Sequence, residues 1–202
     1  MSADAARPRS FQVLLVGGAS GTGKTGVASR LANHFAIGTS AVDDFQVILE
    51  QMTTPEQQPV IHFWRTSDPD ALSAEEIMIQ GVEVARVMRI ALEAVIADHL
   101  KSRQPVVLEG DFIPPALAAQ TSFASEANNG RVRSVFIYEA DEKQIIRNLW
   151  EREPEAGEQV KRAKVSWLQG QWLAQECDRW GVPAILARPW ETLFERVLEA
   201  LE

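Results

Sequence analysis

A glycine-rich loop placed directly after an apolar strand is the feature of this sequence that most restricts its fold. The strand is expected from Phe11 to Val16, and the loop that follows, GGASGTGKT at residues 17–25, matches the spacing G-x-x-x-x-G-K-T from Gly18. Such a loop turns successive backbone N–H groups inward to form an anion-binding concavity, and the next helix adds the positive end of its dipole. The pattern therefore predicts an α/β fold that binds a nucleoside triphosphate at the end of its first strand.

The residues of this loop have expected roles with a nucleoside triphosphate and Mg²⁺. Lys24 can reach the β and γ phosphates as a point charge, so we expect it to be catalytic as well as nucleotide-binding. The hydroxyl of Thr25 is suited to ligate Mg²⁺. We expect nine residues to form the phosphate site: Gly18, Ala19, Ser20, Gly21, Thr22, Gly23, Lys24, Thr25 and Gly26.

A second motif overlaps the first. The segment from Gly21 to Gly26 matches the dinucleotide fingerprint G-x-G-x-x-G, and the acidic pair Asp43-Asp44 follows at a roughly suitable distance. The first glycine of that fingerprint should lie where the strand ends, whereas Gly21 lies several residues beyond Val16. This spacing favours a wide phosphate loop over a tight dinucleotide turn.

Size and charge exclude several classes of partner. The 202 residues suffice for one α/β domain, which we expect over 11–202 after a disordered lead-in at 1–10. A net charge of −8 argues against broad binding to nucleic acid or anionic membranes, since both require a basic face. The single cysteine, Cys177, excludes an internal disulfide, and no apolar run reaches the roughly 18 residues of a membrane span. We expect a cytoplasmic protein, monomeric or homodimeric, whose partner is a small-molecule substrate.

Strand and helix patterns alternate along the rest of the chain, as in a parallel sheet covered by helices on both faces. Gly38 is expected to end the helix after the loop, and a capping box at residues 73–76 opens a long helix to about Ser102. Residues 45–70 look irregular because prolines interrupt them. Five strands are expected, at 11–16, 39–42, 105–109, 132–138 and 183–187. Further helices are expected from Asp141 to a break at 153–157, from about 158 to Gly181, and from 190 to 201.

Acidic residues follow these strands at the edge of the sheet where open α/β sheets bind ligands. Glu109 ends an apolar strand and is expected to hold Mg²⁺, with a solvated loop acid as the alternative. Asp111 could share that task or approach the acceptor as a catalytic, substrate-binding group. Asp43 or Asp44 is expected to orient or deprotonate the acceptor, and Asp43 is slightly favoured because Asp44 could instead cap the next helix.

Basic residues gather around a Pro-Gly break late in the chain, where Arg147 and Arg152 are followed by Lys161, Arg162 and Lys164. We expect residues 147–164 to form a mobile lid over the nucleotide, with Arg147 and Arg152 binding it and Arg147 taking part in catalysis. A solvated helix face explains any one of these residues better, because surface arginine and lysine are common, but it explains the group as a whole less well.

Two further segments suggest substrate contacts. Arg65, within the cluster His62-Phe63-Trp64-Arg65, could clamp an anionic acceptor, and Arg86 lies in the same stretch of chain. Aromatic packing beside a surface arginine is an equally good explanation of that cluster. After the last strand, Arg188 and Pro189 are expected to offer a surface for the adenine ring, with core packing as the alternative for the neighbouring tryptophan.

With these residues together, the chain resembles the P-loop small-molecule kinases, in the branch that contains shikimate, nucleoside, chloramphenicol and 2-phosphoglycerate kinases. Residues 17–25, 106–110 and 147–152 look most like 2-phosphoglycerate kinase. The resemblance implies a three-layer P-loop NTPase fold, a five-stranded parallel sheet in the order 2-3-1-4-5, ATP with Mg²⁺, and lid arginines that close on ATP. Asp111 departs from the pattern, because a second acid here disfavours an anionic acceptor.

The function expected from the sequence is an ATP-dependent phosphotransferase that moves the γ-phosphate of ATP to a hydroxyl of a small metabolite, such as a 2-phosphoglycerate-like compound. A nucleoside or nucleotide kinase is the alternative within the same class. A nucleotide-gated regulatory protein that binds ATP is the alternative of another class. A GTPase is disfavoured because the guanine-reading motif Asn-Lys-x-Asp does not occur.

Overall fold

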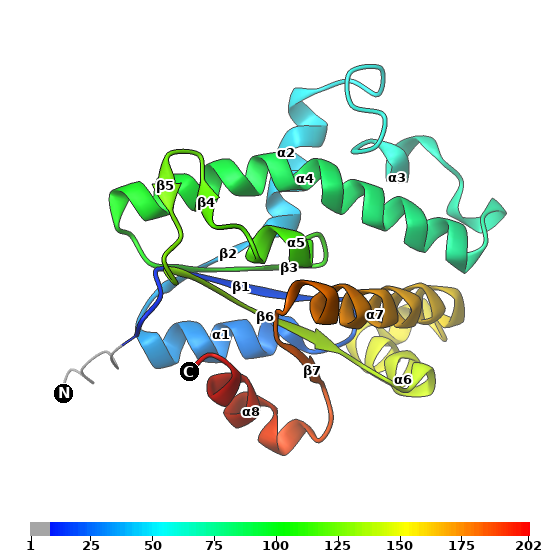
Figure 1. The fold of residues 1–202 in the computed structure, drawn as a ribbon. Helices are drawn as coiled ribbons and strands as arrows, with labels where there is room; N and C mark the ends of the chain where they lie inside the picture. The colour runs from blue at the N-terminus through cyan, green and yellow to red at the C-terminus, as the bar shows by residue number, and fades with distance from the viewer. Residues whose placement is uncertain (1–8) are drawn as a thin grey trace.

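A computed structural model describes residues 9–202, and most of the lead-in predicted at 1–10 lies outside this range. Its centre is a five-stranded sheet built from β1 (Val13–Gly18), β2 (Gly38–Ala41), β3 (Val106–Gly110), β6 (Val132–Tyr138) and β7 (Ala184–Leu186). The strand order is β2-β3-β1-β6-β7, and every neighbouring pair is parallel (Figure 1). The predicted order 2-3-1-4-5 is confirmed, because β6 and β7 are the fourth and fifth strands of this sheet along the chain. The strands β4 (Ser122–Phe123) and β5 (Glu126–Ala127) form a separate antiparallel hairpin.

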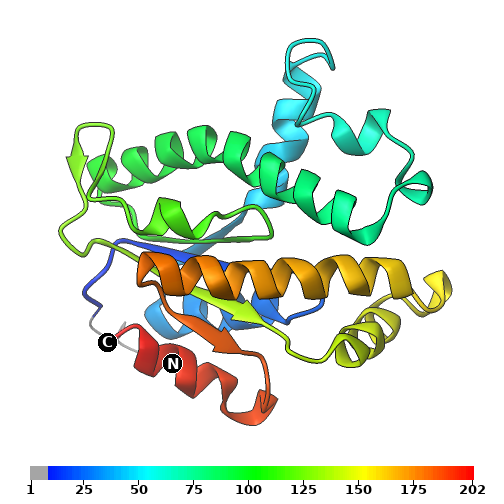
Figure 2. The ribbon, with the colours of Figure 1, turned by 45° about the vertical axis from the view of Figure 1, so that its right-hand side comes forward.

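Helices cover both faces of this sheet because the side chains of β1 alternate between them. Leu14 and Val16 pack with α1 (Lys24–Phe35) and α8 (Leu193–Ala200), whereas Val13 and Leu15 pack with α4 (Ala74–Ser102) and α7 (Val160–Trp180). Figure 2 shows α1 and α8 on one side and α4 and α7 on the other. All four β1 side chains are fully buried, as expected for a central parallel strand.

The segment after β2 differs from the prediction. Instead of a strand over 39–42 and an irregular stretch from 45, β2 ends at Ala41 and helix α2 (Val42–Met52) begins at once. Asp43 and Asp44 therefore lie in the first turn of a helix, where carboxylates are favoured by the helix dipole. Phe45 and Leu49, spaced four apart, pack against the core, and this spacing was the missed helical signal. The short helices α3 (Phe63–Thr66) and η1 (Pro69–Ala71) follow.

Most predicted helix ends are confirmed. Ser73 and Glu76 form the reciprocal capping box of α4, Asp141 caps α6 (Glu142–Arg152), and Gly181 ends α7 in the left-handed conformation. Gly38 was wrongly assigned as the end of α1, because Ala36 adopts the left-handed conformation with φ 52° and Gly38 begins β2. The shorter elements are α5 (Pro115–Ala118), η2 (Pro154–Ala156) and η3 (Trp190–Thr192).

The fold gives information on the single cysteine and on membrane spanning. Cys177 is buried in α7, and this burial raises the pKa of its thiol to about 12, so the group is a poor nucleophile. Within residues 9–202, no helix combines the length and the apolar composition that a membrane span requires.

Candidate active site

The loop between β1 and α1 has a shape that only glycine permits at two positions. Gly18 and Gly23 have φ of 154° and 81°. A Cβ at Gly18 would lie 2.4 Å from the carbonyl oxygen of Ile137, and one at Gly23 would lie 1.9 Å from the indole ring of Trp190. Thr22 donates a hydrogen bond of 2.8 Å to the carbonyl of Ala19 inside the turn. The loop is thereby held between β6 and the segment after β7.

Three carboxylates meet the end of this loop. Lys24 Nζ lies 2.5 Å from Asp111 Oδ1, and the two side chains are 10% and 22% exposed. Thr25 Oγ1 donates to the Glu109 carboxylate at 3.2 and 3.3 Å. A Cβ at Gly110 would lie only 3.3 Å from Asp43 Oδ1, so this glycine lets the start of α2 approach the tip of β3. The predicted residues Lys24, Thr25, Asp43, Glu109 and Asp111 are therefore brought together.

The acidic surroundings change the titration of Asp43. Its side chain is exposed, yet the protein around the carboxyl group removes part of its hydration. This loss, followed by the negative charge of Asp111, raises the pKa of Asp43 above its usual value, with Glu109 adding to the rise and Lys24 opposing it. Asp44, the next residue in the same helical turn, is exposed, and its predicted role stays a prediction.

The residues expected to hold Mg²⁺ fit that ion. Mg²⁺ takes oxygen ligands and usually binds through one or two carboxylates together with substrate phosphates and water. The Thr25 hydroxyl and the Glu109 carboxylate provide such oxygens side by side at the phosphate loop. In the part of the chain that the structure describes, no group of three or more His, Cys, Asp or Glu could hold a metal ion.

A cleft of about 560 Å³ opens beside Lys24 and Thr25, and we call it the nucleotide cleft. Asn148 donates a 2.8 Å hydrogen bond to the carbonyl of Gly21 and receives one of 3.3 Å from Arg188. Arg188 also lies 3.6 Å from the buried carboxylate of Glu139 and 5.1 Å from the centre of the Trp190 ring. The cleft is lined by Gly21, Gly23, Lys24, Thr25, Gln144, Arg147, Asn148, Glu151, Arg152, Arg188 and Trp190.

Other residues predicted to bind the nucleotide lie near this cleft but do not line it. Ala19 is buried, Gly26 is exposed on the first turn of α1, and Ser20 lines a second cavity. The Pro189 carbonyl accepts a hydrogen bond of 3.0 Å from Arg196, so this part of the predicted adenine surface contacts α8.

Sequence reasoning missed Gln144, Asn148 and Glu151 in the lining of this cleft, and also Glu139, which lies behind the lining and pairs with Arg188. No local motif marks Asn148. Glu139 directly follows β6 at the ligand-binding edge of the sheet, and this position was the available signal.

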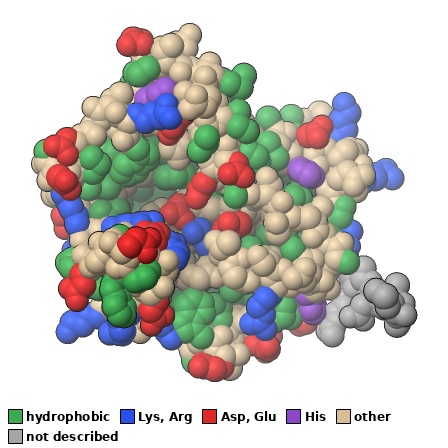
Figure 3. Space-filling model, turned by 180° about the vertical axis from the view of Figure 1, so that it is seen from behind, with side chains coloured by type: hydrophobic (Ala, Val, Ile, Leu, Met, Phe, Trp, Pro, Cys, Tyr) green, Lys and Arg blue, Asp and Glu red, His purple; other side chains and the backbone are tan. Residues whose placement is uncertain are grey.

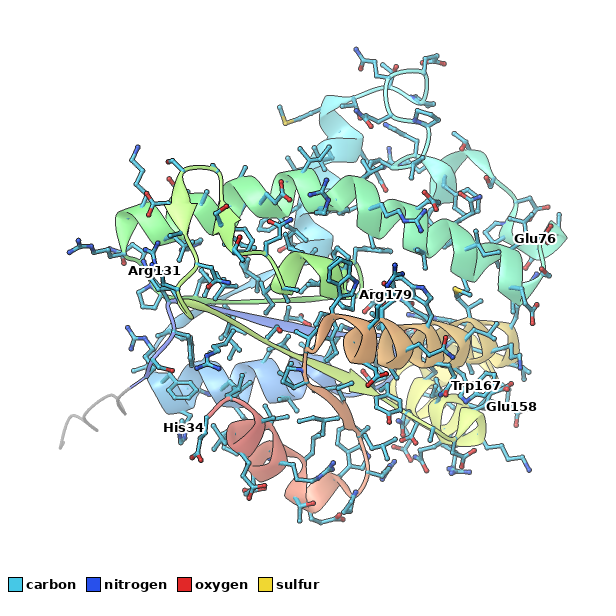
Figure 4. All side chains as sticks on the ribbon, in the orientation of Figure 1. His34, Glu76, Arg131, Glu158, Trp167 and Arg179 are labelled. Atoms are coloured by element: carbon cyan, nitrogen blue, oxygen red, sulfur yellow. The ribbon has the colours of Figure 1, made fainter. Side chains whose placement is uncertain are left out.

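The predicted lid region connects α6 with α7. Arg152 and Arg162 each place a guanidinium nitrogen 3.4 Å from Ser20 Oγ, and both pair with Glu153 at 2.8 Å. Arg147 lines the nucleotide cleft and lies 3.5 Å from Asp141. Trp167 of α7, labelled in Figure 4, donates a hydrogen bond of 2.9 Å to the carbonyl of Ala140, which precedes α6. Motion of this segment stays a prediction.

The second cavity, of about 450 Å³, lies between α4 and α7 on the other side of the phosphate loop. We call it the acceptor cavity. Asp111 and Ser20 line its inner end, and Trp64 and Phe112 contribute aromatic surface. Figure 3 shows a hollow with hydrophobic side chains in its wall and acidic and basic side chains at its inner edge. Asp111 thus connects the acceptor cavity with Lys24 of the nucleotide cleft.

Two predicted substrate residues lie away from this cavity. Arg65 is about half exposed and pairs with Glu50 at 3.1 Å. Arg86 pairs with Glu83 on the outer side of α4 and lines a separate depression with Trp172 and other residues. Within the His62–Arg65 cluster, Trp64 lines the acceptor cavity, whereas His62 is buried, with Nε2 3.1 Å from Thr53 Oγ1. Trp64 and Arg65 are adjacent in the short helix α3, and the sequence alone does not indicate which of them faces the cavity.

Solved structures align with nearly the whole length of this chain. A gluconokinase from Sinorhizobium meliloti is 17% identical, with a TM-score of 0.52 over 96% of this chain and 93% of that one. An uncharacterised protein from Eubacterium ventriosum has 14% identity and a TM-score of 0.50 over 94% and 97%. A shikimate kinase from Acinetobacter baumannii has 15% identity and a TM-score of 0.48 over 95% and 93%.

No protein-family model and no curated protein sequence matches this chain. The structural likeness, at identities this low, establishes architecture, and it agrees with the order of strands and the phosphate loop found here. The chain has the fold of the P-loop small-molecule kinases.

Proposed function

We propose that this protein is an ATP-dependent phosphotransferase that transfers the γ-phosphate to a hydroxyl group of a small acceptor. The observation that carries this proposal is the ion pair between Lys24 and Asp111, since it connects two separate cavities at the phosphate loop. A nucleotide-binding switch needs one cleft, whereas a transferase needs two sites that meet where the phosphoryl group moves.

Each residue has a task in this proposal. Lys24 binds the β and γ phosphates, and its charge balances the charge that develops during transfer. Thr25 and Glu109 hold Mg²⁺, which neutralises phosphate charge when it is bound. Asp43 and Asp111 face the acceptor hydroxyl, and one of them orients it and takes its proton. Arg147, Arg152 and Arg188 bind the nucleotide from the far side of the cleft.

Two classes of acceptor can be compared with the residues that line the acceptor cavity. A 2-phosphoglycerate-like acceptor would need arginine or lysine free to bind its carboxylate and phosphate. The aromatic surface of Trp64 and Phe112 instead favours the second candidate, a nucleoside kinase, because bases and other rings pack well on such side chains.

The test is a transfer assay with γ-labelled ATP, Mg²⁺ and a panel of hydroxylated metabolites. We expect a labelled product that forms only with particular acceptors. Slow ATP hydrolysis that no acceptor accelerates would instead support the nucleotide-gated regulatory alternative.

A further inference from the structure

Gly81 keeps part of the acceptor cavity open. It lies in the interior of α4, where glycine is a poor helix former, and its φ is not among the positive values that would require glycine. The residue is buried, yet a Cβ built on it would meet nothing within 4 Å in the described part of the chain. Since Gly81 lines the acceptor cavity, the missing side chain adds room for a ligand.

The wall around this space is mostly apolar. Ile77 and Met78 come from the same stretch of α4, and Val165 faces them from α7. Trp64 of α3 and Phe112 after β3 complete this wall. An apolar wall of this kind favours a ligand with a ring or another compact hydrocarbon body, because such a body gains by leaving water.

The charged residues of the cavity are already engaged within the protein. Lys161 donates hydrogen bonds of 2.7 and 3.1 Å to the carbonyls of Pro69 and Asp70. Arg162 pairs with Glu153 at 2.8 Å and also donates to Gln159 at 2.8 Å. The acids Asp70 and Asp111 balance these two cations along the lining. An anionic ligand would compete with these partners for the two cations and would also approach two carboxylates.

The carboxylate of Asp111 can serve a neutral ligand. Its Oδ1 is buried and lies 2.5 Å from Lys24 Nζ as an ion pair, whereas the side chain as a whole is 22% exposed and lines the cavity. A carboxylate oxygen is an acceptor, and a ligand hydroxyl group is a suitable donor to it. The cavity thus combines an acceptor for one hydroxyl with an apolar space beyond it.

We propose that the phosphate acceptor is an uncharged alcohol that carries an apolar ring, and that Gly81 sets how large this ring can be. This inference rests on the proposed function, because it assigns the acceptor of the same transfer reaction. The hydroxyl lies at Asp111 beside the phosphate loop, and the ring lies between α4 and α7 against Met78 and Phe112.

Binding to the full chain without nucleotide tests the inference directly. The probes are two uncharged ring alcohols, thymidine and 1-phenyl-1,2-ethanediol, and three anions, gluconate, shikimate and 2-phosphoglycerate, measured by calorimetry and saturation-transfer NMR. We expect at least one ring alcohol to bind about tenfold or more tightly than every anion. Tighter binding of an anion, or binding of none of the five probes, would overturn the inference.

Variants of α4 test the role of Gly81. Gly81→Leu should fill the space and weaken ring-alcohol binding by about tenfold or more, while the affinity for ATP stays unchanged. Ile90→Ala, an exposed change on the same helix, is the matched control. Gly81→Ala should weaken binding less and raise the thermal stability of the helix, and it serves if the leucine variant fails to fold. Unchanged binding in both glycine variants would contradict the proposal.

These results are separable from a failure of the proposed function. If an anionic acceptor is phosphorylated and depends on Lys24, the transferase proposal stands and the acceptor class is wrong. If Lys24→Ala leaves transfer intact, the transferase mechanism is wrong whatever the binding data show.

Discussion

The nucleotide cleft and the acceptor cavity lie on opposite sides of one loop but are built differently. The nucleotide cleft is lined by the loop, Lys24, Thr25 and several arginines, so a ligand bound there would contact mostly charged and polar groups. The acceptor cavity presents apolar side chains from α3, α4 and α7, and its two acids, Asp70 and Asp111, are balanced by the cations Lys161 and Arg162. Charge recognition of phosphate requires a local motif, whereas recognition of an apolar body requires surfaces assembled from distant segments. The two cavities should therefore respond differently to substitution.

The largest effect is expected where the two regions meet. Lys24→Ala should lower the rate of phosphoryl transfer by about 10²–10³ or more with every acceptor, because the phosphates lose their main fixed cation. Initial rates of ADP formation provide the measurement, and Lys101→Ala, at the remote end of α4, is the control. Full turnover in the Lys24 variant would show that the loop is not a working phosphate site.

The second prediction concerns the acids on the acceptor side. Asp43→Asn or Asp111→Asn should lower kcat by roughly 10²–10⁴ if that group takes the acceptor proton, while ATP binding remains. Added Mg²⁺ should not restore the rate. Comparison of the two variants identifies the base, and normal kcat in both would move proton transfer away from this corner.

On the nucleotide side, Glu109→Gln should behave differently from these variants. It should raise the Mg²⁺ concentration needed for half-maximal activity by about 10–100-fold, the range typical for lost metal-site interactions. Activity should return in part at high Mg²⁺, because phosphates and Thr25 still bind the ion. A loss of activity that added Mg²⁺ does not restore would indicate that Glu109 acts on the acceptor, as proposed for Asp43 and Asp111.

The smallest effect is a change in stability with pH. The raised pKa of Asp43 means that the folded protein holds this proton more tightly than the unfolded chain does. The ionised group therefore opposes folding at neutral pH, and the effect fades as pH falls toward the ordinary aspartate pKa. The Asp43→Asn variant should therefore have a higher free energy of unfolding than the unmodified protein at pH 7. This difference should disappear in acid. Urea titrations at several pH values measure it, and a pH-independent difference would contradict the assigned cause.

Part of the site could be predicted because it is encoded over short distances in the chain. The loop at 17–25 contains its own turn residues, a lysine and a hydroxyl group, so its shape and its proposed role could be predicted from spacing alone. The position of Glu109 at the end of an apolar strand was likewise readable, because parallel strands present their carboxyl ends at one edge. Capping residues such as Ser73 and Asp141 were readable since caps act within three residues.

Other features depend on contacts between distant segments, and only the tertiary structure decided them. The pairing of Lys24 with Asp111 depends on the parallel neighbours β1 and β3, and Arg152 and Arg162 meet at Ser20 through the turn that joins α6 to α7. Arg65 and Arg86 have the right chemistry for an anionic acceptor but point to Glu50 and Glu83. The acceptor cavity, with Gly81 in its wall, exists only where α4 packs beside α7. The sequence by itself determined the glycine-rich loop with its lysine and threonine, because that motif is local, whereas the shape and charge of the acceptor cavity arise from packing between elements far apart in the chain.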